Sequence, residues 1–361
     1  MQDNPPTSTD PSSGPLVSRQ TAWLPGYWYV LCESKDLRRR PLQRSLYGKP
    51  LVLFRDGEGR AGALTDRCPH RNVPLSIGRV ESGRLQCAYH GWEFDRLGAC
   101  KGVPGLCSTA EDRARDAESH AVREEDGFVW VWGEPGVEPD RAPPNYGVGR
   151  SPGYSNIRQS VVFDATLHAT IENALDVPHT AFLHRGLFRG GRDPVEVLAK
   201  VTRSPDSVQV EFVGEPRPPG LVARILSPSG GVVTHFDRFL MPSVAQVEYR
   251  LGDENHFRIT GYCTPVSPTR TAVFSSVDFN LRIPHWVVRP FVVPIAMRVF
   301  AQDAWVLKAQ TETVTHFGGE RFTSTAIDLI GGQVWRLMRR AEQGRFSEPE
   351  PDWIREVSLQ V

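Results

Sequence analysis

Two short segments near the start of the chain place cysteine and histidine side chains at spacings that suit a metal centre. Cys68 and His70 are one residue apart, and Cys87 and His90 are two residues apart. Two thiolates and two imidazoles suit either a tetrahedral zinc ion or an iron–sulfur centre. Zinc fingers group the two cysteines together and the two histidines together, whereas here each segment supplies one of each. The interleaving favours a two-iron cluster, with thiolates on one iron and imidazoles on the other.

This mixture of ligands has a chemical purpose. Replacing two thiolates by neutral imidazoles raises the reduction potential of a two-iron cluster to between about −150 and +300 mV. Such a centre accepts electrons readily and passes them on. Gly91 follows the second histidine and Gly78 lies between the segments, where each lets the backbone turn tightly. Zinc remains the alternative metal.

The two segments resemble the cluster-binding loops of the Rieske family, which read C-x-H and C-x-x-H. The match extends to the residues that follow, CPHRNVPL in the first segment and CAYHGWEFD in the second. The resemblance implies that Cys68, His70, Cys87 and His90 bind a [2Fe-2S] cluster. A separate G-x-G-x-x-G pattern, residues 57–62, lies between two predicted strands, so it indicates a hairpin turn rather than a dinucleotide loop.

A second constellation lies in ENALDVPHTAFLH, residues 172–184. Asp176 and His179 have the i,i+3 spacing that places two side chains on one helix face. His184 would fall on a different face of an ideal helix, so a break is needed, and Pro178 is a plausible cause. Two histidines and a distant carboxylate make the facial triad of non-haem Fe(II) oxygenases. Taken alone, the segment also fits a helix with two ordinary histidines and a capping Asp.

With the first motif upstream, this segment resembles the catalytic iron motif N-x-x-D-x-x-H-x4-H of Rieske non-haem iron oxygenases. The spacing from Asn173 to Asp176 is similar to that of the vanillate demethylase and dicamba monooxygenase group. The resemblance implies that His179 and His184 bind iron. It also implies that Asp176 links an iron-binding histidine to a cluster histidine of a neighbouring subunit, and that Asn173 belongs to the catalytic motif.

The third iron ligand must be a carboxylate elsewhere in the chain. Family members place it on a C-terminal helix followed by a hydrophobic-and-AQ pattern, which selects Asp303 in FAQDAWVLKAQTE. Three other acidic residues remain alternatives: Glu312, Asp328 and Glu172.

The surrounding elements predict an α+β chain in two domains. Short β-prone runs from Trp23 to about Pro143 indicate a small antiparallel sandwich or barrel. A helical pattern follows near 165–184, then a strand meander over 207–280 and a helix over about 291–315 with Pro294 in its first turn. We therefore expect a disordered tail over 1–20, a Rieske domain over 21–143 and a catalytic domain over 144–361. The resemblance implies that this last domain has the helix-grip fold.

Composition excludes some function classes. The chain has 361 residues, with 42 basic and 42 acidic side chains, so nothing in the charge balance indicates nucleic-acid binding. The first residues lack the features of a secretory signal, and the most apolar later stretch is interrupted by Pro and Arg. We expect a soluble, cytoplasmic protein without a membrane span. The six cysteines are too sparse for a disulfide framework.

The resemblance implies an oxygenase component that uses O2 and electrons from a separate NAD(P)H-dependent ferredoxin or flavin reductase. The expected reaction is hydroxylation or oxidative demethylation of a small aromatic or polycyclic compound at mononuclear Fe(II), in a head-to-tail homotrimer. The alternatives are cis-dihydroxylation, a non-catalytic Rieske electron carrier and a zinc-stabilised binding module. Alternating apolar residues of the meander are candidate substrate walls: Val247, Tyr249, Phe257, Ile259, Val277 and Phe279.

Overall fold

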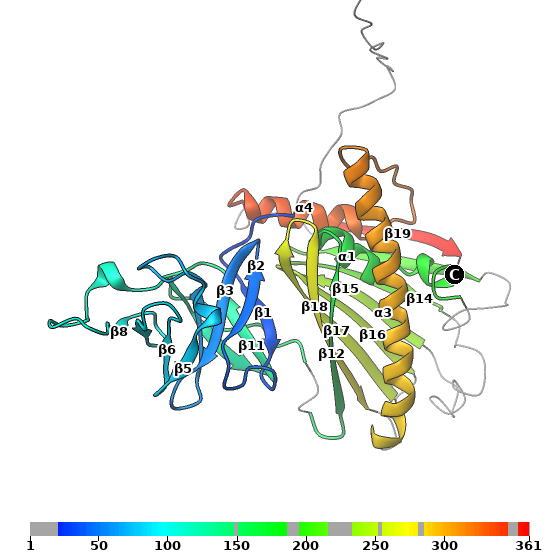
Figure 1. Ribbon diagram of the computed structural model, residues 1–361. Helices are drawn as coiled ribbons and strands as arrows, with labels where there is room; N and C mark the ends of the chain where they lie inside the picture. The colour runs from blue at the N-terminus through cyan, green and yellow to red at the C-terminus, as the bar shows by residue number, and fades with distance from the viewer. Residues whose placement is uncertain are drawn as a thin grey trace, which may run out of the picture.

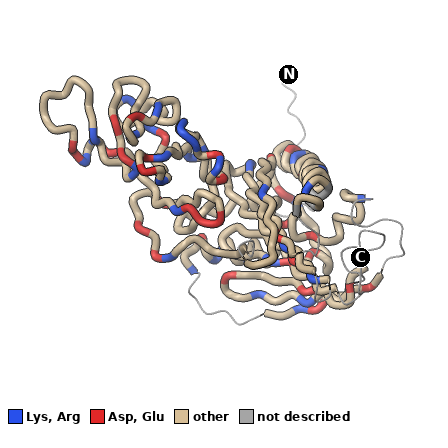
Figure 2. Tube along the Cα trace, turned by 90° about the horizontal axis from the view of Figure 1, so that it is seen from below, with Lys and Arg blue, Asp and Glu red and all other residues tan. Residues whose placement is uncertain are grey.

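The computed structural model describes residues 21–147, 151–185, 195–215, 233–251, 255–280, 285–345 and 353–360. The predicted tail over residues 1–20 lies outside this set. Figure 1 shows two parts: a group of small sheets built from the N-terminal strands, and one large sheet covered by helices. Figure 2 shows basic and acidic residues interspersed along both parts.

The N-terminal part is built only of strands and short 3-10 turns, as predicted. Its three sheets have the orders β1-β11-β10, β2-β3-β4-β9 and β5-β6-β7-β8. The strands are β1 (Trp28–Glu33), β2 (Leu42–Leu46), β3 (Lys49–Arg55), β4 (Ala61–Thr65), β5 (Arg79–Glu81), β6 (Arg84–Gln86), β7 (Glu93–Phe94), β8 (Cys100–Gly102), β9 (Ser119–His120), β10 (Val122–Glu125) and β11 (Phe128–Trp132). The G-x-G-x-x-G pattern joins the antiparallel strands β3 and β4, so the predicted hairpin turn is confirmed.

The C-terminal part contains an eight-stranded antiparallel sheet of order β12-β18-β17-β16-β15-β14-β13-β19. Its strands are β12 (Ser155–Phe163), β13 (Glu196–Arg203), β14 (Ser207–Val213), β15 (Val233–Leu240), β16 (Val244–Leu251), β17 (Asn255–Ser267), β18 (Arg270–Asn280) and β19 (Trp353–Gln360). The succession from β14 to β18 confirms the predicted meander. Strands β12, β13 and β19 were missed: β12 and β19 pair only with strands distant in sequence, whereas β13 also pairs with its neighbour β14.

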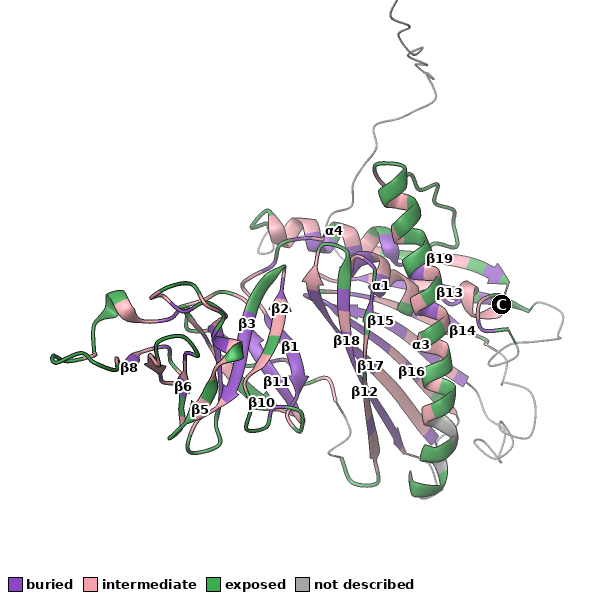
Figure 3. Ribbon diagram, viewed as in Figure 1, coloured by how far each residue is buried: buried purple, intermediate pink, exposed green. Residues whose placement is uncertain are grey.

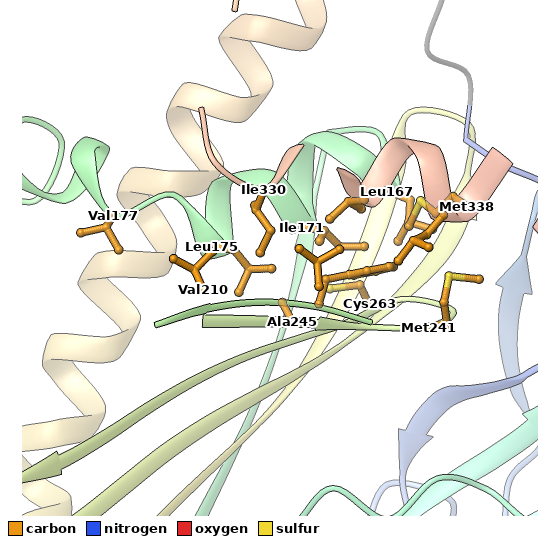
Figure 4. Packing of buried hydrophobic residues seen from close by; sticks show 14 of the residues in the cluster. Leu167, Ile171, Leu175, Val177, Val210, Met241, Ala245, Cys263, Ile330 and Met338 are labelled. Carbon is orange, nitrogen blue, oxygen red and sulfur yellow. The ribbon is translucent and has the colours of Figure 1, made fainter. Parts of the chain in front are cut away.

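Three helices cover one face of this sheet, which we call the inner face. They are α1 (Leu167–Leu175), α3 (His285–His316) and α4 (Gly331–Glu342). Alternate residues of β15 are buried on the inner face, as the period of a strand requires: Val233, His235, Asp237 and Phe239. Leu175 and Ile171 of α1 pack with Val210 and Ala245 of the sheet, and Figure 4 shows this main core.

Helix α3 begins earlier than predicted. The expectation that Pro294 lies in the first turn was wrong, because α3 starts at His285 and contains both Pro290 and Pro294. Each proline removes one backbone hydrogen bond. Contacts with the sheet override this local preference: Val293 packs against the apolar cluster of Ile157, Val277 and Phe279. Figure 3 shows that much of the outward side of α3 is exposed.

The two parts meet through an apolar cluster and a set of hydrogen bonds. Side chains of β1 and β11 pack with side chains of β16, β17 and β18; the set is Trp28, Val30, Phe128, Trp130, Trp132, Val244, Tyr262 and Phe274. The Tyr47 and Gly48 amides donate to the carbonyls of Pro265 and Val266 at 2.6 and 2.8 Å. The Thr264 hydroxyl donates to the Val30 carbonyl at 2.6 Å. The junction is therefore packed rather than a bare linker.

The predicted domain boundary at residues 143 and 144 stays a prediction, and residues 148–150 of the predicted linker lie outside the described set. Ala22 and Leu24 precede β1, yet they are buried in the main core of the C-terminal part. The first described residues therefore contact the catalytic-domain core as well as leading into the N-terminal sheets.

Candidate metal centres

The two cysteine–histidine loops have the same backbone geometry. In the first loop the Cys68 amide donates to the Val73 carbonyl, and the Asn72 amide donates back to the Cys68 carbonyl, both at 2.9 Å. In the second, the Cys87 amide donates to the Trp92 carbonyl at 2.8 Å, and Gly91 donates back to Cys87 at 3.1 Å.

The residue four positions after each cysteine has a left-handed backbone. The φ angle is 61° at Asn72 and 72° at Gly91. Asparagine and glycine are among the residues that adopt this region most readily. The sequence thus encodes two matching turns that present their side chains to one place.

The loops bring like ligands together. The thiols of Cys68 and Cys87 are buried and close enough to interact, and burial together with the Cys87 thiol raises the pKa of Cys68 to about 11. Both cysteines are free of disulfides. The rings of His70 and His90 lie with their centroids 4.6 Å apart, and Trp92 stacks on His70 at 4.7 Å.

These donors fit a two-iron cluster. The buried Nδ1 atom of His70 has no hydrogen-bond partner among the described residues. A thiol pair on one side and an imidazole pair on the other match the ligand division of such a cluster. Among the described residues, only a different group of side chains, treated below, brings three metal-binding atoms within 4.8 Å of one another. The four loop side chains are therefore spread more widely than the ligands of a single zinc ion.

The second centre forms where helix α1 ends. Thr166 caps the start of α1, accepting a hydrogen bond from the Ala169 amide at 3.1 Å. At the other end Asp176 leaves the helical conformation, with φ −93° and ψ 106°. Its carboxylate then accepts the His179 amide at 3.2 Å and starts a 3-10 turn, Pro178–Ala181. The predicted break in the helix near Pro178 is thus present, and both histidines follow it.

This break turns the two histidine rings toward each other. The Nε2 atoms of His179 and His184 are 3.2 Å apart. Asp303 of α3 places Oδ1 3.2 Å from Nε2 of His184 and 3.7 Å from Nε2 of His179. Octahedral ligands about 2.1 Å from a metal are about 3 Å apart. The three atoms have that spacing.

The other acidic candidates lie in different surroundings. Glu172 faces Nδ1 of His168 at 3.6 Å, Glu312 lies 3.9 Å from Lys308, and Asp328 accepts hydrogen bonds from Thr325. Asp303 is the acidic residue of these four that the fold brings to both histidines. That it binds iron stays a prediction.

The electrostatics of Asp303 call for a cation. Burial raises the pKa of its carboxyl group, and His184, His179 and a hydrogen bond from Asn173 offset only part of that effect. Oδ1 faces the Nε2 atoms of His184 and His179 at 3.2 and 3.7 Å and has no well-formed hydrogen bond among the described residues. Burying a charged carboxylate without enough compensating charge costs free energy. A metal ion bound between Asp303 and the two imidazoles would supply that charge.

Each histidine ring is held from behind. Nδ1 of His179 lies against the Asp176 carbonyl, with the Asp176 carboxylate 3.4 Å away. Burial lowers the pKa of His179, but Asp176 and Asp303 outweigh it and leave the pKa raised. Nδ1 of His184 lies 2.9 Å from the amide oxygen of Gln302. Sequence reasoning missed Gln302, although its place directly before Asp303 was a signal.

The two centres lie in different parts of the molecule. In Figure 1 the sheet β5-β6-β7-β8, which carries the cluster loops, is at the end of the N-terminal part that points away from α1 and α3. His90 is exposed there, and Tyr89 beside it is 62% exposed. The second centre lies between α1 and α3 on the inner face of the large sheet.

Two protein families match the chain. Residues 27–111 match the Rieske [2Fe-2S] domain, and residues 163–343 match the vanillate O-demethylase oxygenase C-terminal domain. The chain belongs to the Rieske non-haem iron oxygenases. This confirms the family expected from the two motifs. The cofactors of the family are a [2Fe-2S] cluster and a mononuclear non-haem iron.

Several curated proteins resemble this Rieske oxygenase. The dicamba O-demethylase oxygenase component of Stenotrophomonas maltophilia is 35% identical over 44% of this chain and 47% of its own length. Chloroplastic Protein TIC 55 of Arabidopsis thaliana is 30% identical over 80% of this chain and 53% of its length. The chain thus spans about half the length of these two relatives. The chloroacetanilide N-alkylformylase oxygenase component of Rhizorhabdus wittichii is 27% identical over 88% of this chain and 94% of that protein.

Solved structures confirm the fold. Dicamba monooxygenase bound to dicamba superposes with a TM-score of 0.75 at 24% identity, covering 89% of this chain and 98% of that chain. At this identity the likeness speaks for the fold alone. Within the part of the chain that the structure describes, no helix is long and apolar enough to cross a membrane.

Proposed function

We propose that this Rieske oxygenase is the terminal oxygenase component of a multicomponent system. It would use O2 and electrons from a separate NAD(P)H-dependent reductase or ferredoxin to hydroxylate or oxidatively demethylate an aromatic or polycyclic compound. The observation that carries this proposal is the convergence of His179 Nε2, His184 Nε2 and Asp303 Oδ1. Two imidazoles and one carboxylate are the ligand set of non-haem oxygenases.

Cys68, His70, Cys87 and His90 would hold the cluster, and His179, His184 and Asp303 would hold the mononuclear iron. When bound, the cluster supplies single electrons and the iron binds and activates O2. The remaining residues position these groups. The Asp176 carboxylate orients the His179 ring, and Asn173 holds the Asp303 carboxylate through a hydrogen bond.

The apolar side chains on the inner face of the sheet are evidence for an apolar substrate that contains a ring. Tyr249 of β16 lies opposite Phe257 of β17, which in turn lies opposite Phe279 of β18. Two residues further along these strands, Val247 pairs with Ile259 on the same face. These are the candidate walls expected from the alternating sequence pattern. We place the substrate on this wall, beside the part of it that Val293 of α3 covers.

The reaction class is an inference from relatives. Dicamba O-demethylase is named for the removal of a methyl group from oxygen. This favours monooxygenation over cis-dihydroxylation, the second candidate. Because chlorophyllide a oxygenase and TIC 55 are chloroplastic proteins, a cytoplasmic location stays a prediction.

A head-to-tail homotrimer would connect the two centres. The cluster loops point away from the iron-site residues, and an apolar cluster packs the two parts together. Electrons would then pass from the cluster of one subunit to the iron of the next. One surface feature supports docking of a neighbouring subunit near the iron-site residues: Phe182, between the two histidines, is 84% exposed.

Metal analysis of anaerobically purified protein tests the proposal. We expect a Rieske spectrum, additional iron beyond the cluster, and substrate-dependent O2 consumption with a reductase in a screen of aromatic compounds. Asp303→Ala should lose the additional iron and all turnover, since it removes one of three ligands, while the cluster spectrum persists. A colourless, zinc-loaded protein would refute the proposal. A cluster without mononuclear iron would favour an electron carrier instead.

A further inference from the structure

The two histidines of the mononuclear site have different supports. His179 is backed by Asp176, through both its carbonyl and its negatively charged carboxylate. His184 is backed by the neutral side-chain amide of Gln302, whose Oε1 lies 2.9 Å from Nδ1. One imidazole of the site is therefore supported by a negatively charged side chain and the other by a neutral one.

The Gln302 contact selects one form of the His184 ring. A neutral imidazole carries its proton on one nitrogen and a lone pair on the other. An amide oxygen only accepts, so a hydrogen bond to Oε1 requires the proton to be on Nδ1. The lone pair is then on Nε2, the atom that lies 3.2 Å from both Asp303 Oδ1 and His179 Nε2.

The opposite form would interfere with metal binding. If the amide nitrogen faced Nδ1, the proton would be on Nε2 and would point toward Asp303. That proton would occupy the space between His184 Nε2, His179 Nε2 and Asp303 Oδ1, which lie 3.2 to 3.7 Å apart. The form with Nε2 unprotonated leaves this space to a metal ion.

Helix α3 delivers the ligand and the support together. Gln302 and Asp303 are consecutive, and 118 residues separate Gln302 from His184 along the chain. The His184 side chain is buried, with 2% of its surface exposed, so its ring has little room to reorient alone. A single placement of α3 thus sets the carboxylate and the orientation of the second imidazole.

We propose that Gln302 is a positioning residue that holds His184 with Nδ1 protonated and Nε2 directed at the metal ion. This inference rests on the proposed function, because it takes His184 to be a metal ligand. It predicts that the acceptor oxygen at position 302 is required for tight metal binding, and that a neutral acceptor is sufficient.

Co(II) titration tests this inference in the full-length protein with its cluster intact and its mononuclear iron removed. Gln302→Leu removes the acceptor and should weaken Co(II) binding by roughly 10- to 100-fold, the usual effect of losing such a support. Gln302→Glu keeps an acceptor and should bind at least as tightly as wild type, with a shifted Co(II) spectrum. Gln310→Leu, an exposed glutamine on the same helix, should bind like wild type.

The outcomes separate the two proposals. If Gln302→Leu binds Co(II) within about twofold of wild type, the role of Gln302 is overturned and the proposed function stands. The same holds if Gln302→Glu binds Co(II) as weakly as Gln302→Leu. Wild-type protein that binds no Co(II) at a site lost in Asp303→Ala would overturn both. Gln302→Met, unbranched and apolar, repeats the test if the leucine variant fails to fold, with the cluster spectrum as the folding control.

Discussion

Two buried atoms at the candidate centres lack a well-formed hydrogen bond among the described residues. They are Asp303 Oδ1 and His70 Nδ1. Folded proteins pair nearly all such groups, so an unsatisfied buried atom calls for an explanation. Five other buried atoms share this property, and these two differ in having metal-binding side chains beside them: His184 Nε2 is 3.2 Å from Asp303 Oδ1, and the rings of His70 and His90 are 4.6 Å apart.

Asp176 should matter for turnover and not for metal content. Asp176→Asn keeps an oxygen that accepts the His179 amide but removes the charge beside His179 Nδ1. We expect both metals to be retained while turnover falls by at least about 100-fold, because the charge that orients and tunes the ring is lost. Iron analysis and steady-state O2 consumption would measure this, with Asp328→Asn as the surface control. Unchanged turnover would contradict the bridging role.

A second buried histidine has a structural role on the inner face. His235 lies between Asp237, 3.0 Å from Nε2, and Glu215, 2.6 Å from Nδ1. Its ring is stacked between Phe212 and Tyr249, at centroid distances of 4.5 and 4.0 Å. Burial lowers the pKa of His235, but the two carboxylates outweigh it and raise the pKa to about 9. The protonated ring therefore joins three neighbouring strands.

This pKa predicts a pH-dependent stability. A raised folded-state pKa stabilises the fold fully below the unfolded value near 6.5, and that contribution disappears as pH rises through about 9. The difference in unfolding free energy between wild type and His235→Gln should fall by up to about 3 kcal/mol between pH 6.5 and 9.5. Chemical denaturation at several pH values measures it. His316→Gln, at an exposed histidine, should show no such trend, and a constant difference for His235→Gln would contradict the argument.

At the scale of elements, each centre depends on where one segment approaches another. Helix α3 brings Asp303 and Gln302 to the segment after α1, and Val293 to the sheet. In the N-terminal part, the strands β5 and β6 hold the two cluster loops at a fixed separation. Gly78 lies at the start of β5, where a Cβ atom would come within 2.1 Å of the Gln86 carbonyl oxygen.

Gly78→Ala should therefore disturb the cluster loops. The atom it meets is backbone, so the two strands have to separate, and overpacking of this kind costs about 1–3 kcal/mol. We expect lower thermal stability and partial loss of the cluster absorbance, while iron at the mononuclear site is retained. Gly332→Ala is the control, because a Cβ there meets no atom within 4 Å. Equal cluster content in the two variants would show that the close approach is not needed.

At the scale of the whole molecule, the separation of the centres is the dominant fact. The cluster loops and the iron-site residues lie in different parts of the chain, joined by a buried interface that includes Trp28, Trp130 and Tyr262. A packed interface of this kind resists domain rotation. The proposed ring of three subunits would bring the cluster loops of one subunit to the iron-site residues of the next.

Mixed trimers test this path. Cys87→Ser removes a proposed cluster ligand and Asp303→Ala removes a proposed iron ligand, so each variant alone should be inactive. Coexpression with two affinity tags, followed by purification on both, selects trimers containing each variant. A head-to-tail ring then has one productive interface of three, so we expect about one third of wild-type turnover. Inactive mixed trimers, alongside active wild type, would place electron transfer within one chain.

Local motifs in the sequence determined the chemistry of both centres. Cys68, His70, Cys87 and His90 lie in two short turns whose shape depends on neighbouring residues. The break in the helix before His179 and His184 lies at Asp176 and Pro178. Such features are encoded within a few residues, so spacing and residue type were enough to predict them. The strands of the meander were predictable for the same reason.

Only the tertiary structure decided which distant groups meet. Asp303 and Glu312 have similar sequence surroundings on one helix, but α3 turns only Asp303 toward the histidines. Gln302 joined the site through a contact across 118 residues. Strands β12 and β19 pair only with strands far along the chain. Convergence of this kind depends on the packing of whole elements, which the spacing of residues along the chain does not record.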